Sequence, residues 1–118
     1  MMDLMMITVK NQFEGIHCYP DAPEGVEFLK NPHRHMFHVE SEIEVYHDDR
    51  ELEFILVQRN IQKFLDTSEK LQHKSCEMIA REVRDYLRKT YPIEGHWHRK
   101  MSIRVSEDGE NGVYLKEI

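Results

Sequence analysis

The chain has few cysteines, glycines and prolines and no long hydrophobic run. Its 118 residues include two cysteines, five glycines and four prolines. Two cysteines are too few for the disulfide framework of a small secreted domain, and no apolar stretch approaches the roughly 20 residues that span a membrane. We therefore expect one reduced, cytoplasmic domain covering residues 1–118, long enough to bury a core without covalent cross-links.

Positive charge is also scarce, since 16 Lys and Arg residues stand against 22 Asp and Glu residues, for a formal net charge of -6. Non-specific binding of nucleic acid requires an excess of cations, which this chain does not have. We therefore expect neither a nucleic-acid partner nor a membrane partner. Histidine, in contrast, is frequent, with eight residues.

Alternating apolar and polar residues predict strands in the first and last thirds of the chain. The expected strands cover residues 4–13 and 39–46 and the segments around 101–105 and 113–115. The turn between the last two is expected over EDGENG, residues 107–112. Two edge strands in such a sheet favour association between chains, because unpaired edges must be paired, covered or charged.

The middle of the chain shows helical periodicity instead. Apolar residues at helical spacing predict amphipathic helices over 55–66 and 75–90, the second with Ser75 as its N-cap. Three of the four prolines fall in 18–32, which indicates a loop. The order ββααββ predicts an α+β domain in which two helices cover one face of an antiparallel four-stranded sheet.

The histidines form a candidate metal site. His33 and His35 lie two positions apart where the second strand begins, so strand alternation directs both side chains to one face. His17, at the end of the first strand, is the natural third ligand for a zinc ion that keeps an open position. His96 and His98 form a competing pair just before the third strand. The residues alone leave the choice between the two pairs open.

A longer series of motifs matches a known family. The segments are FEGIHCYPDAPEG at 13–25, HRH at 33–35, LEF at 52–54, SCEMIA at 75–80 and VSEDGENGVYL at 105–115. In order and spacing over nearly the whole chain, they resemble the 6-pyruvoyl-tetrahydropterin synthase and 6-carboxytetrahydropterin synthase family. The resemblance implies the tunnelling fold and a homo-oligomeric barrel, a trimer or a hexamer, with active sites at subunit interfaces.

The same resemblance implies a zinc cofactor and a small-molecule pterin substrate. The family's three zinc-binding histidines fall on His17, His33 and His35, which favours this set over the competing pair. The family's pterin-anchoring glutamate falls on Glu107. A carboxylate suits that role because it accepts two parallel hydrogen bonds from the amino and ring N–H groups of a pterin.

Two other motif positions carry over with changes. The family's Thr-x-Glu motif, near the bound pterin, falls on Ser75, Cys76 and Glu77, which makes the first two candidate substrate contacts. On the helix, Cys76 is also expected to be a small buried thiol. Arg34 replaces the glycine of His-Gly-His, and alternation directs its side chain away from the metal.

The largest departures concern proton transfer. The family's catalytic cysteine precedes His-Gly-His, where this chain reads EFLK at 27–30. Some relatives use a glutamate in this loop, so Glu24 and Glu27 are candidate bases. The family's Asp-His pair falls on Asp66 and Thr67, and His73 is the candidate replacement for the missing histidine.

Two functions agree with this pattern. The first is a zinc-dependent pterin-processing carbon–oxygen lyase, acting on dihydroneopterin triphosphate or a related pterin with altered acid–base residues. The second is a catalytically inactive oligomeric scaffold that binds zinc and a pterin or purine. Retention of the metal ligands and of Glu107 supports a heterocycle site in both cases, whereas loss of the cysteine favours the second.

Overall fold

Four strands and two α-helices make up the part of the chain that the computed structural model describes, residues 3–67, 73–95 and 98–117. The strands are β1 (Met5–His17), β2 (His33–Val45), β3 (Met101–Glu107) and β4 (Asn111–Lys116), and the helices are α1 (Phe54–Asp66) and α2 (Cys76–Thr90). A short 3-10 helix, Glu27–Lys30, lies in the loop between β1 and β2. The predicted ββααββ order is confirmed. Among these residues, no helix combines the length and apolar character needed to cross a membrane.

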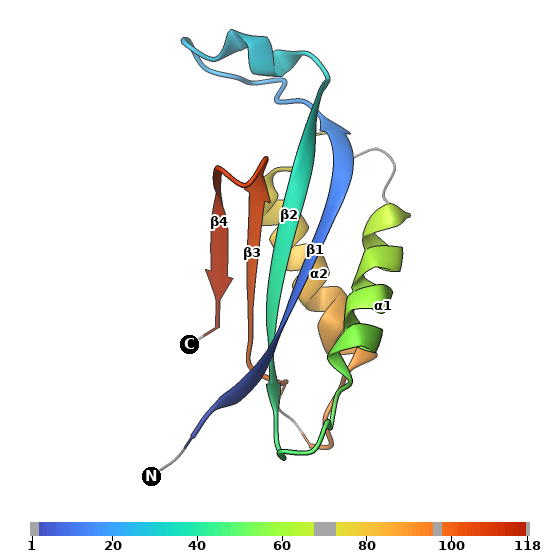
Figure 1. Ribbon diagram of the computed structural model, residues 1–118. Coiled ribbons are helices and arrows are strands. Elements are labelled where there is room, and N and C mark those ends of the chain that lie inside the picture. The colour runs from blue at the N-terminus through green and yellow to red at the C-terminus, as the bar shows by residue number, and fades with distance from the viewer. Residues whose placement is uncertain (1–2, 68–72, 96–97, 118) are drawn as a thin grey trace.

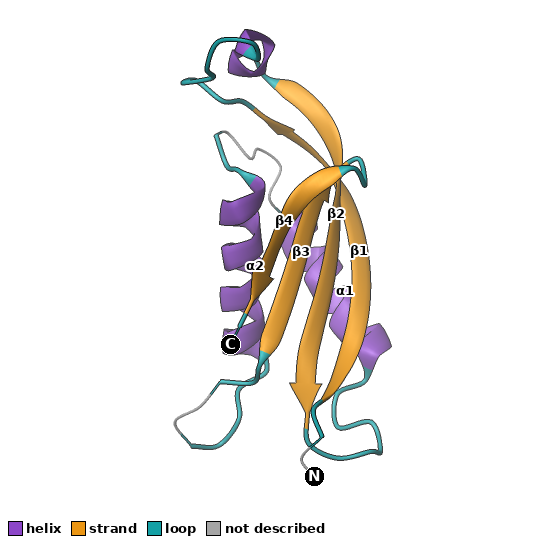
Figure 2. Ribbon diagram, turned by 90° about the vertical axis from the view of Figure 1, so that its left-hand side faces the viewer, coloured by secondary structure: helices purple, strands orange, loops and turns teal. Residues whose placement is uncertain are grey.

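The strands form one antiparallel sheet in the order β1-β2-β3-β4. Both helices lie on the same side of it, as the two perpendicular views show (Figure 1 and Figure 2). Each helix is amphipathic, so packing one apolar stripe per helix against the sheet removes both stripes from water. The predicted α+β architecture, with two helices on one sheet face, is therefore confirmed.

The core lies between the sheet and the helices. On β2, Val39, Ser41, Ile43 and Val45 are buried as alternation predicts, and full burial of each of the three apolar side chains contributes roughly 1.5–3 kcal/mol. The rest of the core comes from the helix-facing side of the sheet and from one stripe of each helix: Val9, Phe13, Phe37, Val57, Ile61, Leu65, Cys76, Ile79, Ala80, Val83, Leu87, Met101, Ile103 and Val105.

The first two strands are longer than the others and longer than predicted. β1 and β2 each have 13 residues, against 7 for β3 and 6 for β4. Their pairing continues to His17 opposite His33, whereas the β2–β3 register ends at Phe37 opposite Glu107. The end of β1, the start of β2, the end of β3 and the start of α2 therefore meet at one end of the molecule (Figure 1).

A buried arginine holds the opposite end of the sheet. Arg99 donates from Nε to the carbonyl oxygen of Tyr91 (3.0 Å), from Nη1 to that of Glu44 (3.0 Å) and from Nη2 to Oε2 of Glu51 (2.7 Å). Its guanidinium also lies 5.2 Å from the centre of the Tyr46 ring, within cation–π range. One side chain thus connects the end of β2, the end of α2 and the segment before α1.

Candidate metal centre

Three histidines and a glutamate converge at the end of the sheet where β1 ends and β2 begins. One ligand atom each from His17, His33, His35 and Glu107 lie within 4.8 Å of one another, and all four side chains are partly buried. We call these four residues the histidine cluster. Arg34 pairs with a glutamate of β1 on the opposite face of the sheet, as strand alternation predicts. The structure thus brings together all three predicted metal ligands.

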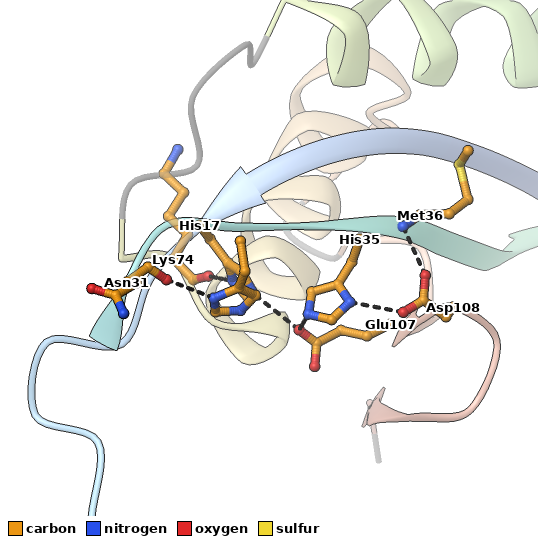
Figure 3. Close-up of polar contacts among 8 residues, drawn as sticks. His17, Asn31, His35, Met36, Lys74, Glu107 and Asp108 are labelled. Atoms are coloured by element: carbon orange, nitrogen blue, oxygen red, sulfur yellow. Dashed lines mark hydrogen bonds and ion pairs between the residues drawn. The ribbon is translucent and has the colours of Figure 1, made fainter. Parts of the chain in front are cut away.

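The three imidazole rings are held in one orientation by hydrogen bonds from Nδ1 (Figure 3). The Nδ1 distances are 2.9 Å for His17 to the Lys74 carbonyl oxygen, 2.9 Å for His33 to the Asn31 carbonyl oxygen and 2.7 Å for His35 to Asp108 Oδ2. These oxygens only accept, so in the neutral rings the proton is assigned to Nδ1 and the lone pair to Nε2. Each ring therefore presents the nitrogen that binds a metal.

The Nε2 atom of His17 faces a carboxylate oxygen instead of a hydrogen-bond donor. This atom is buried and has no hydrogen-bond partner among the described residues, although Glu107 Oε2 lies 2.9 Å away. The same oxygen lies 3.4 Å from His35 Nε2. A nitrogen lone pair and a carboxylate repel each other at such distances unless a proton or a metal ion lies between them. A metal ion on the Nε2 atoms of the three histidines, with the Glu107 carboxylate beside it, would satisfy these atoms together.

The donor set fits zinc. A tetrahedral zinc ion with imidazole nitrogens at about 2.0–2.1 Å would need its ligand atoms roughly 3.4 Å apart, and the ligand atoms of the three histidines lie within 4.8 Å of one another. Imidazole-rich sites suit zinc and other transition metals, whereas magnesium and calcium prefer sites made of oxygen ligands. The residues present therefore agree with the ion that the family resemblance implies.

A cavity of about 510 Å³ opens beside the histidine cluster. That volume lies in the range of small-molecule sites, about 300–1,000 Å³. Besides cluster residues, the lining includes side chains from the first loop, the start of α2 and β4: Tyr19, His73, Ser75, Cys76, Glu77 and Asn111. The predicted substrate contacts Ser75, Cys76 and Glu107 therefore lie around one cavity.

Two residues at the start of α2 have structural roles as well. The Ser75 hydroxyl accepts a hydrogen bond from the N–H of Met78 (3.2 Å), which makes Ser75 the N-cap, as predicted. Cys76 is buried on the apolar face, and burial together with the nearby carboxylates of Glu107 and Glu77 raises its pKa to about 11. It is therefore a protonated thiol at neutral pH, in agreement with its interpretation as a buried helix residue.

Comparison with known proteins supports the architecture. No protein-family profile matches the chain, and no curated protein sequence matches it. Among solved structures, 6-pyruvoyl tetrahydropterin synthase of Plasmodium falciparum is similar, with a TM-score of 0.67 over 97% of this chain and 98% of that chain. The chain has the tunnelling fold. Sequence identity to that structure is 14%, so the similarity establishes the fold alone.

Within this tunnelling fold, the four candidate acid–base residues lie apart. The Glu27 carboxylate accepts a hydrogen bond from the N–H of Gly25 (2.9 Å), which lowers its pKa, and Glu24 is exposed on the same loop. Asp66, at the end of α1, accepts a hydrogen bond from a side chain of its own helix. Of the four, only His73 is among the described residues that line the cavity. Their catalytic roles stay predictions.

The competing histidine pair is also untested. His96 lies outside the described residues. His98 is exposed and precedes the start of β3, whereas Glu107 lies at the end of that strand. His98 therefore lies at the opposite end of β3 from the histidine cluster.

Sequence reasoning missed the groups that orient the rings. The Asp108 carboxylate accepts hydrogen bonds from the N–H of Met36 and from Nδ1 of His35. Both hydrogen bonds lower the pKa of Asp108, and the one from Met36 has the larger effect. Its only signal in the sequence is an acidic residue directly after the predicted anchor Glu107. The carbonyl oxygens of Asn31 and Lys74 leave no signal, because every residue has a carbonyl.

Proposed function

We propose that this protein binds a zinc ion through His17, His33 and His35 and processes a pterin in the adjacent cavity as a zinc-dependent lyase. The observation that carries the proposal is the convergence of three oriented imidazoles and Glu107 beside a cavity of about 510 Å³, which His17, His33 and Glu107 line. The substrate is dihydroneopterin triphosphate or a related pterin. The same fold in 6-pyruvoyl tetrahydropterin synthase of Plasmodium falciparum supports this substrate class.

Each part of the site has a separate task in this proposal. Zinc, when bound, supplies a Lewis acid that polarises an oxygen of the substrate side chain. The Nδ1 contacts keep the imidazole rings turned toward the ion. Glu107 belongs to the histidine cluster and also lines the cavity, and its carboxylate accepts hydrogen bonds from the amino and ring N–H groups of the pterin. Ser75 and Cys76 contact the same ligand from the start of α2.

Proton transfer is the incomplete part of the site within one chain. Cys76 is a weak acid with a pKa of about 11, so it does not serve as a base near neutral pH. His73 lines the cavity and is the candidate base of the same chain. Glu24, Glu27 and Asp66 contribute only if a neighbouring subunit brings them to the cavity.

Assembly into a homo-oligomer, a trimer or a hexamer, is therefore part of the proposal. Within the described part of the chain, β1 and β4 are the edge strands of the sheet, and their outer edges pair with no other strand. Large apolar side chains are also exposed near the cavity and at the far end of the sheet, among them Tyr19, Phe28 and Phe54. Light scattering that gives the mass of a single 14.2 kDa chain would contradict the assembly.

A second candidate function is an inactive scaffold that binds zinc and a pterin or purine. The observation that favours it is the scattered placement of the acid–base candidates, of which only His73 reaches the cavity among the described residues. Both functions share the metal site and the heterocycle site. They differ only in whether the bound ligand reacts.

Two measurements separate these functions. Elemental analysis of protein purified without chelator is expected to give about one zinc per chain, because one cluster supplies the ligands of one ion. The protein is then incubated with dihydroneopterin triphosphate while pterin absorbance and acetaldehyde release are followed. Turnover that a chelator stops and zinc restores supports the lyase, binding without turnover supports the scaffold, and absence of both zinc and pterin binding contradicts both.

The pterin anchor is tested by Glu107→Gln, with Glu110→Gln of the same hairpin as its control. Loss of hydrogen bonds to a charged group costs about 1.5–3 kcal/mol, so pterin affinity is expected to fall roughly 10- to 150-fold in the first variant. Pterin affinity of the control should stay at the wild-type value. An unchanged affinity in Glu107→Gln would refute the anchor.

A further inference from the structure

Asp108 links the end of β3 to the strand that carries two of the predicted metal ligands. Its Oδ2 lies 2.7 Å from Nδ1 of His35, and its Oδ1 accepts from the N–H of Met36 at 3.0 Å (Figure 3). Its own N–H donates to the carbonyl oxygen of Met36 at 2.7 Å. The backbone is left-handed, with φ of 57°, a conformation that Asp and Asn adopt more readily than most residues. Both carboxylate oxygens therefore have a defined donor on β2.

His35 differs from the other two histidines in the group that accepts the hydrogen bond from its Nδ1. His17 and His33 donate to the neutral backbone carbonyls of Lys74 and Asn31, at 2.9 Å each, whereas His35 donates to a carboxylate at 2.7 Å. A charged acceptor forms the stronger hydrogen bond and makes the ring a better electron donor through Nε2. It also holds the tautomer that leaves Nε2 free to bind a metal.

We propose that Asp108 is a positioning residue of the zinc site, which fixes the orientation and tautomer of His35 and thereby strengthens zinc binding. This inference rests on the proposed function and adds to it a residue that contacts neither metal nor substrate. Removing such a partner from a metal-binding histidine typically lowers metal affinity about 10- to 100-fold, and we expect a loss of that size here.

Asp108→Asn is the most informative variant because it preserves size and backbone preference. The wild-type carboxylate serves two donors, but an amide has only one acceptor oxygen. If that oxygen faces the N–H of Met36, the NH₂ group faces Nδ1 of His35 and favours the tautomer protonated on Nε2, which leaves no lone pair on Nε2 for a metal. Asp108→Gly also tolerates a positive φ and removes the side chain completely. We expect both variants to bind zinc more weakly.

The test measures zinc affinity of the full chain by competition with a chromophoric chelator. Glu110→Gln is the matched control, because it removes one negative charge from an exposed position of the same turn and should change affinity by less than about twofold. Circular dichroism of the metal-free proteins, prepared with a chelator, checks that each variant is folded. If Asp108→Asn does not fold, the zinc affinity of Asp108→Gly is measured instead. Visible absorption of the cobalt-loaded proteins should change in the Asp108 variants and stay unchanged in the control.

A double-mutant cycle shows whether Asp108 acts through His35. In a His35→Ala background, Asp108→Asn should cause little further loss of zinc affinity, because its partner is already absent. The proposal is overturned if the double variant loses zinc affinity by the product of the two single-variant losses. It is also overturned if Glu110→Gln loses as much zinc affinity as Asp108→Asn. If wild type binds zinc but Asp108→Asn binds it equally well, the inference alone is refuted. If wild type binds no zinc, the proposed function is refuted together with the inference.

Discussion

Replacing Arg99 with methionine should destabilise the end of the sheet that lies far from the histidine cluster. The guanidinium is 6% exposed and donates to two backbone carbonyls and to Glu51, whose side chain is 20% exposed. Methionine occupies much of the same volume but has no donor, so all three acceptors lose their partner. Removing one member of a buried ion pair costs about 3–5 kcal/mol, and the partial exposure of Glu51 places our expectation near the lower limit, about 3 kcal/mol.

The destabilisation should depend on pH in a defined direction. The hydrogen bond from Arg99 lowers the pKa of Glu51 below its ordinary value of 4.5. A group whose pKa is lower in the folded state stabilises the fold above the unfolded-state pKa, and this contribution is lost as the pH falls through the folded-state pKa. The difference in free energy of unfolding between wild type and Arg99→Met should therefore be full at neutral pH and shrink on acidification below 4.5.

Urea unfolding of the metal-free protein, followed by circular dichroism, measures both the loss of stability and its dependence on pH. Linear extrapolation gives the free energy of unfolding at each pH. Arg59→Met is the control, because Arg59 is exposed on α1, and such surface substitutions change stability by less than about 0.5 kcal/mol. A loss in Arg99→Met no larger than in this control, or a loss that does not shrink in acid, would refute the reasoning.

Two further predictions concern the cavity and its hairpin. Burial and neighbouring carboxylates raise the pKa of Cys76 to about 11. Iodoacetamide at neutral pH should therefore alkylate the partly exposed Cys18 before Cys76 in folded protein. Equal rates of alkylation at the two cysteines would contradict this account. In Gly112→Ala, the added Cβ would lie 2.1 Å from the Val105 carbonyl oxygen and 2.6 Å from Ser106 Cα. We expect a loss of about 1–3 kcal/mol by thermal or urea unfolding, and wild-type stability would show that the hairpin is less tightly packed than described.

The sequence predicts the middle of each strand better than its ends. Residues such as Val39 and Ile43 alternate with glutamates, so burial on one face produces a clear period of two. From His33 to Met36 the strand carries polar or partly exposed side chains on both faces, and no hydrophobic alternation marks it. Hydrophobic alternation therefore predicts the second strand only over 39–46, whereas the pairing begins at His33.

The same distinction applies to the site. The shared orientation of His33 and His35 follows from strand geometry, and their proximity to His17 follows from antiparallel pairing of the strands. The contacts that orient the rings depend on where the loop and the segment before α2 place their carbonyl groups. Side-chain patterns do not encode those positions. Likewise, the direction of the Glu27 carboxylate depends on the local backbone of its loop, where it binds the N–H of Gly25.

Because His17 pairs with His33, binding of an ion between them depends on the native alignment of β1 and β2. These residues are directly opposite each other at the end of the β1–β2 pair that the loop over 18–32 connects. A slip of β2 by one residue would turn His33 and His35 outward and bring Arg34, a cation, to the inner face. Such a misaligned chain would lose the proposed metal ligands and would bring a positive charge to the place of the proposed ion. An ion bound at these residues would thus favour the native alignment of the two longest strands over a misaligned one.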